Sequence, residues 1–408
     1  MKKILKHFVA LSLVLALLFS FVGCNFLNKT NDKATEDSGA NTTPKEKKPY
    51  TVAYVTDYSN IKNVIFIIGD GMGEAHLDAG ELVYGKEYAF RDNFSLIYSQ
   101  TNSLDSTTNE AITTTDSAAS ATAMATGKLT YNNRLSIGSD FSEFTTILDL
   151  AKSVGKSTAI VTTDYLSGAT PSGFSAHALS RYSTKEIIRS QITSGVDILI
   201  GQYSEDYDKY ADEIKEKYNY VKTYDTEAIL ASKNSDSLCL FNIEKDTDDS
   251  IELKDATNLA LDYIKDDSDG FVIVIEQAHI DKKASDGDFA ATAKAANSLN
   301  DTVEAAISFA STRNDTAVIV TADHETGGLG VSEDTTEYFK TFTREDGFEF
   351  SYEFETSGHT QALVPFYYTG FGAKPELFTT FSSSEQIKNN EIFFIIRDLI
   401  MHGQMVEE

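Results

Sequence analysis

Acidic and imidazole side chains stand directly after several apolar runs of the sequence. They are Asp70 after 63–68, Glu276 at the end of 271–276, and Asp323 at the end of 316–323 with His324 directly after it. Continuously apolar, β-branched runs predict buried parallel strands, whose carboxyl ends meet at one edge of a sheet. Clustered carboxylates repel one another unless divalent cations neutralise them. The sequence therefore predicts a metal site, with mixed oxygen and nitrogen ligands suiting Zn²⁺ and carboxylate plus hydroxyl ligands suiting Mg²⁺.

The stretch "TTTDSAASATAMATGKL" (113–129) consists almost entirely of small residues. Asp116 is a favoured helix-capping residue, and the alanine-rich run after Ser117 predicts a helix that lies close to the sheet. Free N–H groups and the helix dipole favour an anion at such a first turn. Ser117 is therefore a candidate nucleophile beside the predicted metal site. The alternative is a capping serine on a packed helix.

The elements that must position these residues alternate between strands and helices. Further apolar runs at 158–163 and 196–201 predict strands, and the patterns at 143–156 and 291–311 predict helices. This alternation predicts an α/β fold, a three-layer sandwich whose mainly parallel central sheet is flanked by helices. Residues 331–357 break the pattern with threonine, acidic and aromatic residues, and we expect an insertion over the end of the sheet there.

The first 24 residues predict a signal peptide outside this fold. A lysine-rich start precedes an apolar segment (8–22) that is shorter than the roughly 20 residues of a membrane-spanning helix. The end of this segment, "FVGC", resembles the lipobox of bacterial lipoproteins, in which Cys24 carries the lipid; the alternative is an ordinary secreted protein. Residues 25–50 are polar and predict a disordered tether. We expect an exported cell-surface lipoprotein with a catalytic domain at 51–408.

The composition limits the partners that this protein binds. Its 62 acidic and 35 basic residues give a formal net charge of −27, which argues against nucleic acid and anionic membrane surfaces. We expect membrane contact only through a lipid at Cys24, and we leave a homodimer open. Lipidation of Cys24 leaves Cys239 without an intrachain partner, and the surrounding "SLCLFN" predicts an inert thiol in a buried strand.

Six motifs follow one another between about Ile61 and Gly370. They are "IIGDGMG", "TTTDSAASATAMATGK", "ATPSGFSAHALSR", "EQAHID", "TADHETGG" and "SGHT". Their combination and order resemble the alkaline phosphatase family, metal-dependent phosphomonoesterases with a serine nucleophile. The resemblance implies an alkaline phosphatase-like fold, two Zn²⁺ sites and one Mg²⁺ site.

The resemblance also implies a role for each matching residue. Ser117 matches the nucleophile, and Arg181 matches the guanidinium that binds two phosphate oxygens through its planar fork, with Asp116 orienting it. Lys282 matches a basic residue that some members place near the phosphate. The matching metal ligands are Asp281 and His359 for the first zinc, Asp70, Asp323 and His324 for the second zinc, and Asp70, Thr170 and Glu276 for the magnesium.

The sequence departs from the family pattern at two positions. Ser285 stands where the family has a histidine that binds the first zinc, and a neutral serine is a poor zinc ligand. Gly168 stands where the family tends to have Asp or His near the water shell of the magnesium. Three nearby residues are conceivable substitutes for the missing histidine, but none of them is well placed on a regular helix: His279, Asp286 and Asp288.

These inferences predict hydrolysis of small phosphate monoesters through a phosphoserine, with extracellular phosphate scavenging as the expected role. A phosphodiesterase of the same superfamily is one alternative, although the intact "TDSAAS" and Arg181 favour monoesters. A second alternative is a weakly active or non-catalytic phosphate- or metal-binding surface lipoprotein, which the presence of Ser285 supports.

Overall fold

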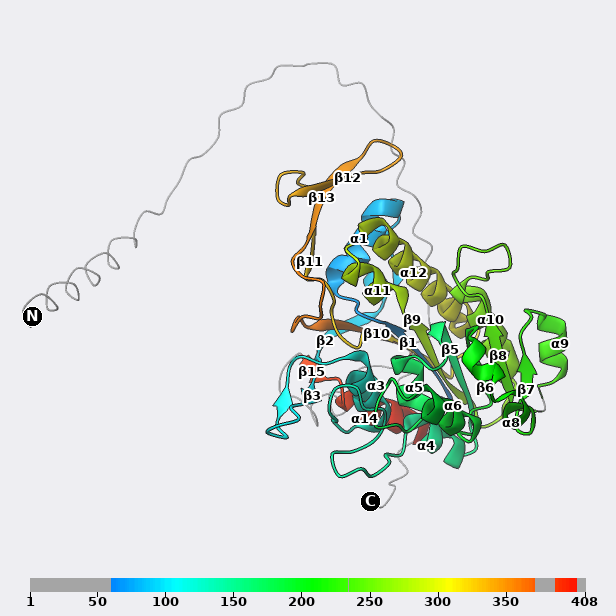
Figure 1. The fold of residues 1–408 in the computed structure, drawn as a ribbon. Coiled ribbons are helices and arrows are strands. Elements are labelled where there is room, and N and C mark those ends of the chain that lie inside the picture. The colour runs from blue at the N-terminus through cyan, green and yellow to red at the C-terminus, as the bar shows by residue number, and fades with distance from the viewer. Residues whose placement is uncertain (1–59, 234, 371–385, 402–408) are drawn as a thin grey trace, which may run out of the picture. The chain divides into compact units, whose positions relative to one another are not determined.

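The computed structural model describes residues 60–233, 235–370 and 386–401. The expected leader (1–24) and tether (25–50) lie outside the described residues. A ten-stranded sheet runs through the described chain in the order β15-β2-β14-β10-β1-β9-β5-β6-β8-β7 (Figure 1). Its strands are β1 Asn63–Gly69, β2 Ser95–Gln100, β5 Ser157–Tyr165, β6 Ile198–Gln202, β7 Asn219–Val221, β8 Ser237–Phe241, β9 Phe271–Gln277, β10 Thr316–Thr321, β14 Val364–Thr369 and β15 Gln386–Lys388.

The central strands pair in parallel, as their continuous apolar runs predict. Neighbours from β10 through β1, β9, β5, β6 and β8 to β7 are all parallel. On the other side of β10, strand β14 is antiparallel to both β10 and β2, and β15 is parallel to β2. The mainly parallel sheet of the predicted α/β class is therefore confirmed.

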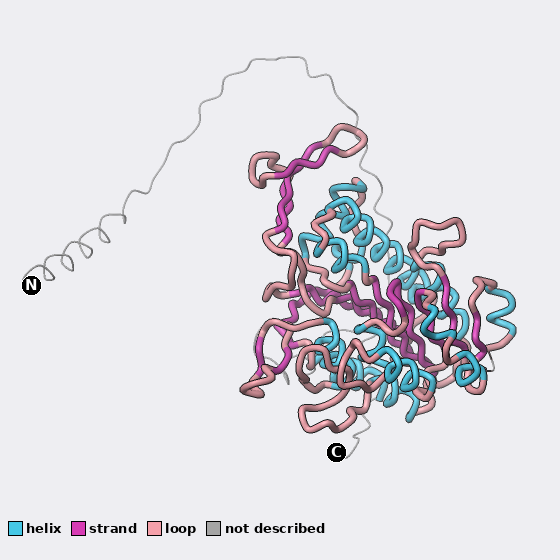
Figure 2. The backbone as a smooth tube through the Cα atoms, viewed as in Figure 1, coloured by secondary structure: helices cyan, strands magenta, loops and turns pink. Residues whose placement is uncertain are grey.

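Helices cover both faces of this sheet (Figure 2). Alternate side chains of β1 enter two separate apolar clusters, because successive residues of a strand point to opposite faces. One cluster contains Val64, Phe66 and Ile68, and the other contains Ile65 and Ile67. The first face is covered by α3 Ser117–Thr126, α4 Ile147–Ser153, α5 Ala169–Ser175, α6 Thr184–Ile192, α7 Glu205–Asp208, α8 Ala211–Lys215 and α14 Glu391–Met401. The second face is covered by α1 Glu74–Tyr84, α2 Ala89–Asn93, α9 Thr226–Ala231, α10 Leu253–Ile264, α11 His279–Ser285 and α12 Phe289–Ser311.

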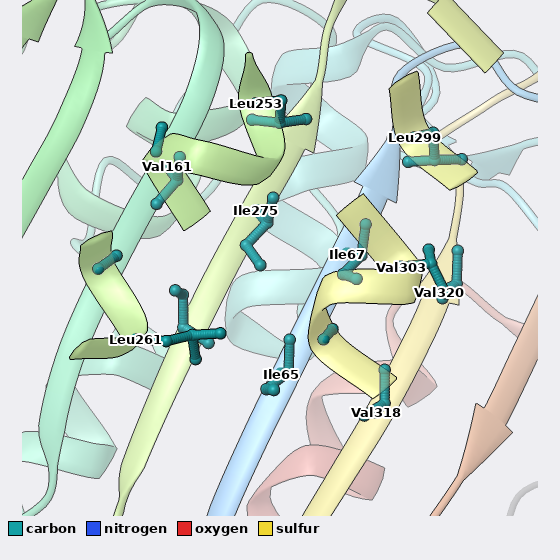
Figure 3. Packing of buried hydrophobic residues seen from close by; sticks show 14 of the residues in the cluster. Ile65, Ile67, Val161, Leu253, Leu261, Ile275, Leu299, Val303, Val318 and Val320 are labelled. Atoms are coloured by element: carbon teal, nitrogen blue, oxygen red, sulfur yellow. The ribbon is translucent and has the colours of Figure 1, made fainter. Parts of the chain in front are cut away.

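Two long helices, α10 and α12, form much of the second layer. Figure 3 shows branched side chains from these helices meeting those of the central strands; the labelled residues are Leu253 and Leu261 of α10, Leu299 and Val303 of α12, and Ile65, Ile67, Val161, Ile275, Val318 and Val320 of the sheet. Full burial of each such side chain contributes about 1.5–3 kcal/mol. This packing holds the carboxyl ends of β1, β9 and β10 in fixed register.

Helix boundaries differ slightly from the sequence expectation, for reasons of capping. Helix α4 begins at Ile147 rather than near residue 143, because Thr146 and Asp149 form a reciprocal capping box. Helix α12 begins at Phe289, two residues earlier than expected, because the Asp288 side chain accepts a hydrogen bond from Ala291 N. None of the helices in the described ranges is long and apolar enough to cross a membrane.

The segment expected as an insertion (331–357) contains most of a separate three-stranded sheet. Its strands are β11 Leu329–Ser332, β12 Lys340–Thr343 and β13 Glu349–Phe354. This sheet packs on α1 and the start of α12, where the rings of Phe289 and Tyr352 stack with centroids 4.0 Å apart. A further pair, β3 Ser103–Leu104 and β4 Ala111–Ile112, forms a short hairpin sheet before α3.

Candidate active site

The predicted acidic residues meet at the carboxyl edge of the sheet. Ile68 of β1 is paired with Glu276 of β9 on one side and Thr321 of β10 on the other, so the three strands end almost level. The backbone then ties the loops together, because Asp70 N donates to Gln277 O at 3.0 Å and Asp281 N donates to Asp70 O at 2.9 Å. Parallel pairing therefore brings residues far apart in sequence to one rim.

Gly71 allows these loops to approach closely. Its φ of +75° lies in the left-handed region, and a Cβ there would stand 2.8 Å from the Asp281 Cα and 2.7 Å from the Thr326 Oγ1. Gly71 N donates to Asp323 Oδ1 at 3.0 Å. A side chain at position 71 would therefore separate the loops that carry the acidic residues.

Helix α3 presents the candidate nucleophile. Asp116 caps the helix by accepting a hydrogen bond from Ala119 N at 3.0 Å, which leaves Ser117 as the first helical residue. The buried Ser117 Oγ lies 3.1 Å from His324 Nε2 and 3.5 Å from Asp70 Oδ1. The small residues of α3 allow it to pack closely against α5. A Cβ on Gly173 of α5 would lie only 2.6 Å from the Ala121 Cβ of α3.

Two groups of side chains offer the ligand set that a metal ion needs. Asp70, Asp323 and His324 form one group, and Asp281, His324 and His359 form the other; within each group the potential ligand atoms lie within 4.8 Å of one another. His324 belongs to both groups. The structure thus brings together the ligands expected for both zinc sites.

Thr326 connects the two groups and was not singled out from the sequence. Its hydroxyl donates to Asp281 Oδ1 at 2.6 Å and lies 3.2 Å from His324 Nδ1. His359 Nε2 lies 3.4 Å from Asp281 Oδ1, and His359 Nδ1 donates to Thr115 O at 2.9 Å. Such hydrogen bonds fix the orientation of ligating side chains. In the sequence, only its position two residues after His324, within the motif "TADHETGG", indicated that Thr326 lies near the site.

Burial and like charge shape the protonation of this cluster. Burial, followed by repulsion from Asp323 and Asp281, raises the pKa of Asp70 well above its usual value. Burial lowers the pKa of His324, which keeps its imidazole neutral. Burial alone would lower the pKa of His359, but its hydrogen bond to Asp281 raises that pKa to about 9. A neutral imidazole among repelling carboxylates is suited to binding a cation.

The third expected metal site lies around Glu276. Burial and repulsion from Asp164 raise the pKa of Glu276 to about 7, although its carboxylate accepts a hydrogen bond from the Thr162 hydroxyl. The Thr170 hydroxyl is buried without a hydrogen-bond partner. It lies near the Glu276 carboxylate and lowers the pKa of that group. A buried carboxylate beside an unpartnered hydroxyl matches the oxygen ligands that Mg²⁺ prefers.

Arg181 is held at the start of α3. Its Nη1 lies 3.1 Å from Asp116 Oδ2, and this same oxygen accepts a hydrogen bond from Asn133 N at 3.0 Å. Arg181 N donates in turn to Asn133 O at 2.7 Å. Asp116 therefore both caps the helix of Ser117 and orients the guanidinium, while the Asn133 backbone, which sequence reasoning missed, fixes the loop.

Lys282 does not lie free beside the expected phosphate position. Its Nζ pairs with Asp164 Oδ1 at 2.5 Å. Asp164 was not among the predicted site residues, although it stands at the end of the predicted strand "TAIVTT", where other strands carry their acidic residues.

None of the three conceivable substitutes for the histidine missing at position 285 joins either ligand group. His279 Nδ1 faces Glu244 Oε2 at 3.7 Å. Asp286 is exposed and lies 3.6 Å from Lys283 Nζ, and Asp288 caps α12. Ser285 itself lies on α11, four residues after Asp281 and on the same face of the helix.

Comparisons with known proteins agree with this geometry. The family described as "Alkaline phosphatase" matches residues 61–206 and 199–367. The chain belongs to the alkaline phosphatase family. Alkaline phosphatase 3 of Bacillus subtilis (strain 168) is 35% identical over 296 residues, which cover 67% of this chain and 63% of that relative. The alkaline phosphatase of Escherichia coli (strain K12) is 28% identical over 339 residues, which cover 67% and 72% of the two chains.

A solved structure extends the similarity to three dimensions. The alkaline phosphatase from the Antarctic bacterium TAB5 superposes with a TM-score of 0.70 at 25% identity, covering 84% of this chain and 99% of that one. The chain spans less than two thirds of the length of the two Bacillus subtilis alkaline phosphatases that it matches. Family membership and the two ligand groups together indicate a metal-binding protein.

Proposed function

We propose that this alkaline phosphatase family member hydrolyses phosphate monoesters through a phosphoserine at Ser117. The observation that carries the proposal is the position of Ser117 Oγ, in the first turn of α3 and within 3.5 Å of both Asp70 and His324. Arg181, whose guanidinium is suited to binding phosphoryl oxygens, forms an ion pair with Asp116, the residue before Ser117.

The proposal includes two Zn²⁺ and one Mg²⁺. The residues fit such ions, because Asp323 Oδ2 and Thr170 Oγ1 are buried without a hydrogen-bond partner. Asp281 and His359 would hold the first zinc, Asp70, Asp323 and His324 the second, and Asp70, Thr170 and Glu276 the magnesium. A variant of the TAB5 enzyme, 27% identical with a TM-score of 0.69, has Mg bound in its M3 site. Bound cations supply charge neutralisation and lower the pKa of hydroxyl groups that they contact.

The side chains of this chain divide the remaining work. Arg181 binds two phosphoryl oxygens, and Asp116 holds its fork in place. Ser117 Oγ attacks phosphorus, so that a serine–phosphorus bond forms while the bond to the leaving oxygen breaks, and the leaving alcohol takes up a proton. Water then attacks the phosphoserine and releases inorganic phosphate and the free serine. Positioning and charge neutralisation are the main requirements of phosphoryl transfer.

Two alternatives remain as candidate functions. A phosphodiesterase of the same superfamily uses similar chemistry. A diester also offers two free phosphoryl oxygens to the forked guanidinium of Arg181, so the two activities are separated by assay. A weakly active or non-catalytic phosphate-binding lipoprotein is favoured by Ser285. The two ligand groups, with Ser117 beside them, support catalysis instead. We further propose an exported, lipid-anchored protein that acts on small phosphorylated molecules outside the cell.

The decisive experiment traps the covalent intermediate. Acid quenching of the protein with labelled phosphate is expected to leave label on the peptide containing Ser117, and Ser117→Ala is expected to abolish both label and turnover. Ser153→Ala, at an exposed serine at the end of α4, serves as the matched control. Label on another peptide would refute the proposed nucleophile. A parallel assay of p-nitrophenyl phosphate and its diester then separates monoesterase from diesterase.

A further inference from the structure

Gly168 and Asp164 face each other at the end of β5. A Cβ built on Gly168 would stand 2.6 Å from Asp164 Oδ2 and 3.0 Å from Asp164 Cγ. Gly168 has φ of −60°, a conformation that any residue adopts, so the backbone torsion does not require glycine. The space that a side chain at position 168 would occupy is therefore taken by the carboxylate of Asp164.

The Asp164 carboxylate also lies beside the expected magnesium ligands. Thr162 pairs in register with Glu276 and donates to its carboxylate. Asp164, two residues further along β5, lies close enough to Glu276 for its charge to raise the pKa of that carboxyl. Asp164 N donates to Thr162 Oγ1 at 2.8 Å, which fixes the backbone at this point. Gly168 lies two residues before Thr170, at the N-cap of α5.

The second oxygen of Asp164 contacts Lys282. The pair Lys282 Nζ–Asp164 Oδ1 measures 2.5 Å, and the Asp164 side chain is 19% exposed. Lys282 follows Asp281 on α11, so Asp164 links the end of β5 to the helix that carries a ligand of the first zinc site. The Asp164 carboxylate thus lies beside Gly168 through one oxygen and pairs with Lys282 through the other.

We propose that Asp164 is a positioning residue that replaces the side chain missing at position 168. Its carboxylate supplies negative charge to the outer shell of the cation held by Thr170 and Glu276, and at the same time holds Lys282. Glycine at position 168 fits this role of Asp164, because a Cβ there would overlap the Asp164 carboxylate in its present position. The inference rests on the proposed function, since it assigns a partner to the magnesium site of the same active centre.

Calorimetric titration of the zinc-loaded protein with Mg²⁺ alone tests this role. Asp164→Asn keeps the shape and removes the charge, and it is expected to weaken Mg²⁺ binding by about 10–100-fold, the usual effect of losing an outer-shell partner. The zinc content is expected to stay unchanged. The matched control is Asp197→Asn. Asp197 pairs with Lys152 at 2.8 Å at the opposite end of β5, with similar side-chain exposure, 22% against 19%.

Lys282→Ala separates an electrostatic role from a merely structural ion pair. Removing the lysine leaves the Asp164 charge uncompensated, so Mg²⁺ binding is expected to tighten, opposite in sign to Asp164→Asn. If both variants shift Mg²⁺ affinity in the same direction, or neither shifts it, the proposal is overturned. Equal weakening in Asp197→Asn would overturn it as well.

Moving the carboxylate provides a rescue. Asp164→Ala combined with Gly168→Asp is expected to recover part of the Mg²⁺ affinity that Asp164→Ala loses. Recovery is partial because the Tyr165 carbonyl, 2.9 Å from the built Cβ, must shift slightly. No recovery would overturn the exchange between positions 164 and 168. Acid-trapped label at Ser117 in the unaltered protein reports on the proposed function separately, so failure of either claim is recognised by its own measurement.

Discussion

The imidazole rings of His324 and His359 are stacked, with centroids 3.5 Å apart and planes 19° from parallel. They lie at the two ends of the segment that forms the separate three-stranded sheet, and an isolated bridge between Thr326 and His359 closes that segment. Gly327 N donates to Gly358 O at 3.0 Å and reinforces the closure. Because His324 is common to both ligand groups, this contact places the two proposed zinc sites next to each other.

The incomplete first zinc site gives the first prediction. Ser285→His is expected to raise the affinity of the Asp281 and His359 group for Zn²⁺ by about tenfold or more, since it restores the usual three protein ligands of catalytic zinc. Turnover should rise with it, and the unaltered protein should depend on added Zn²⁺ or Co²⁺. Metal content and activity measured on the same samples check this.

His279→Ala is the control for that measurement. Its imidazole faces Glu244 rather than the ligand groups, so its loss should leave zinc content unchanged. Two tightly held zinc ions in the unaltered protein, with no gain from Ser285→His, would show that another ligand completes the site.

Loss of the Arg181 guanidinium should weaken phosphate binding specifically. Arg181→Ala is expected to cost roughly 1.5–3 kcal/mol in inhibition by inorganic phosphate, the range for hydrogen bonds to charged groups. Arg181→Lys should recover little, because an ammonium lacks the planar fork. Arg189→Ala, which removes a surface pair with Glu213, is the control. Loss of zinc from Arg181→Ala would assign the residue a structural role instead.

Cys239 should be inert in the folded protein. The thiol is fully buried in β8, and burial raises its pKa, so both access and thiolate formation are suppressed. In a Cys24→Ser background, a disulfide reagent is expected to label Cys239 only after denaturant unfolds the chain. Rapid labelling of the native protein at neutral pH would contradict the buried position.

The lipid anchor stays a prediction, because Cys24 lies outside the described residues. Cys24→Ser is expected to release the protein from membranes into the soluble fraction with activity unchanged, since Cys24 precedes the tether and lies outside the domain that carries the site. Cell fractionation with a phosphatase assay on each fraction measures this. Retention of the variant on membranes would indicate an uncleaved leader.

The sequence by itself determined the features that depend on neighbouring residues. Continuous apolar runs identify the central strands because both faces of a parallel sheet are buried, and capping chemistry places Asp116 and Ser117 at the start of α3. Asp70, Glu276 and Asp323 could be assigned to one rim because parallel strands end on the same side. Strand boundaries and helix α12 followed from the same local rules to within a few residues.

Only the tertiary structure decided which side chains meet between loops. Thr326 joins Asp281 to His324 because separate chain segments approach there. Asp164 takes the space beside Gly168 because the turn between β5 and α5 brings the two positions together. The role of Asp288 as a cap, rather than a metal ligand, was equally invisible in the spacing. Sequence separation says nothing of these contacts, since they depend on how packed helices and turns orient loops that periodicity does not describe.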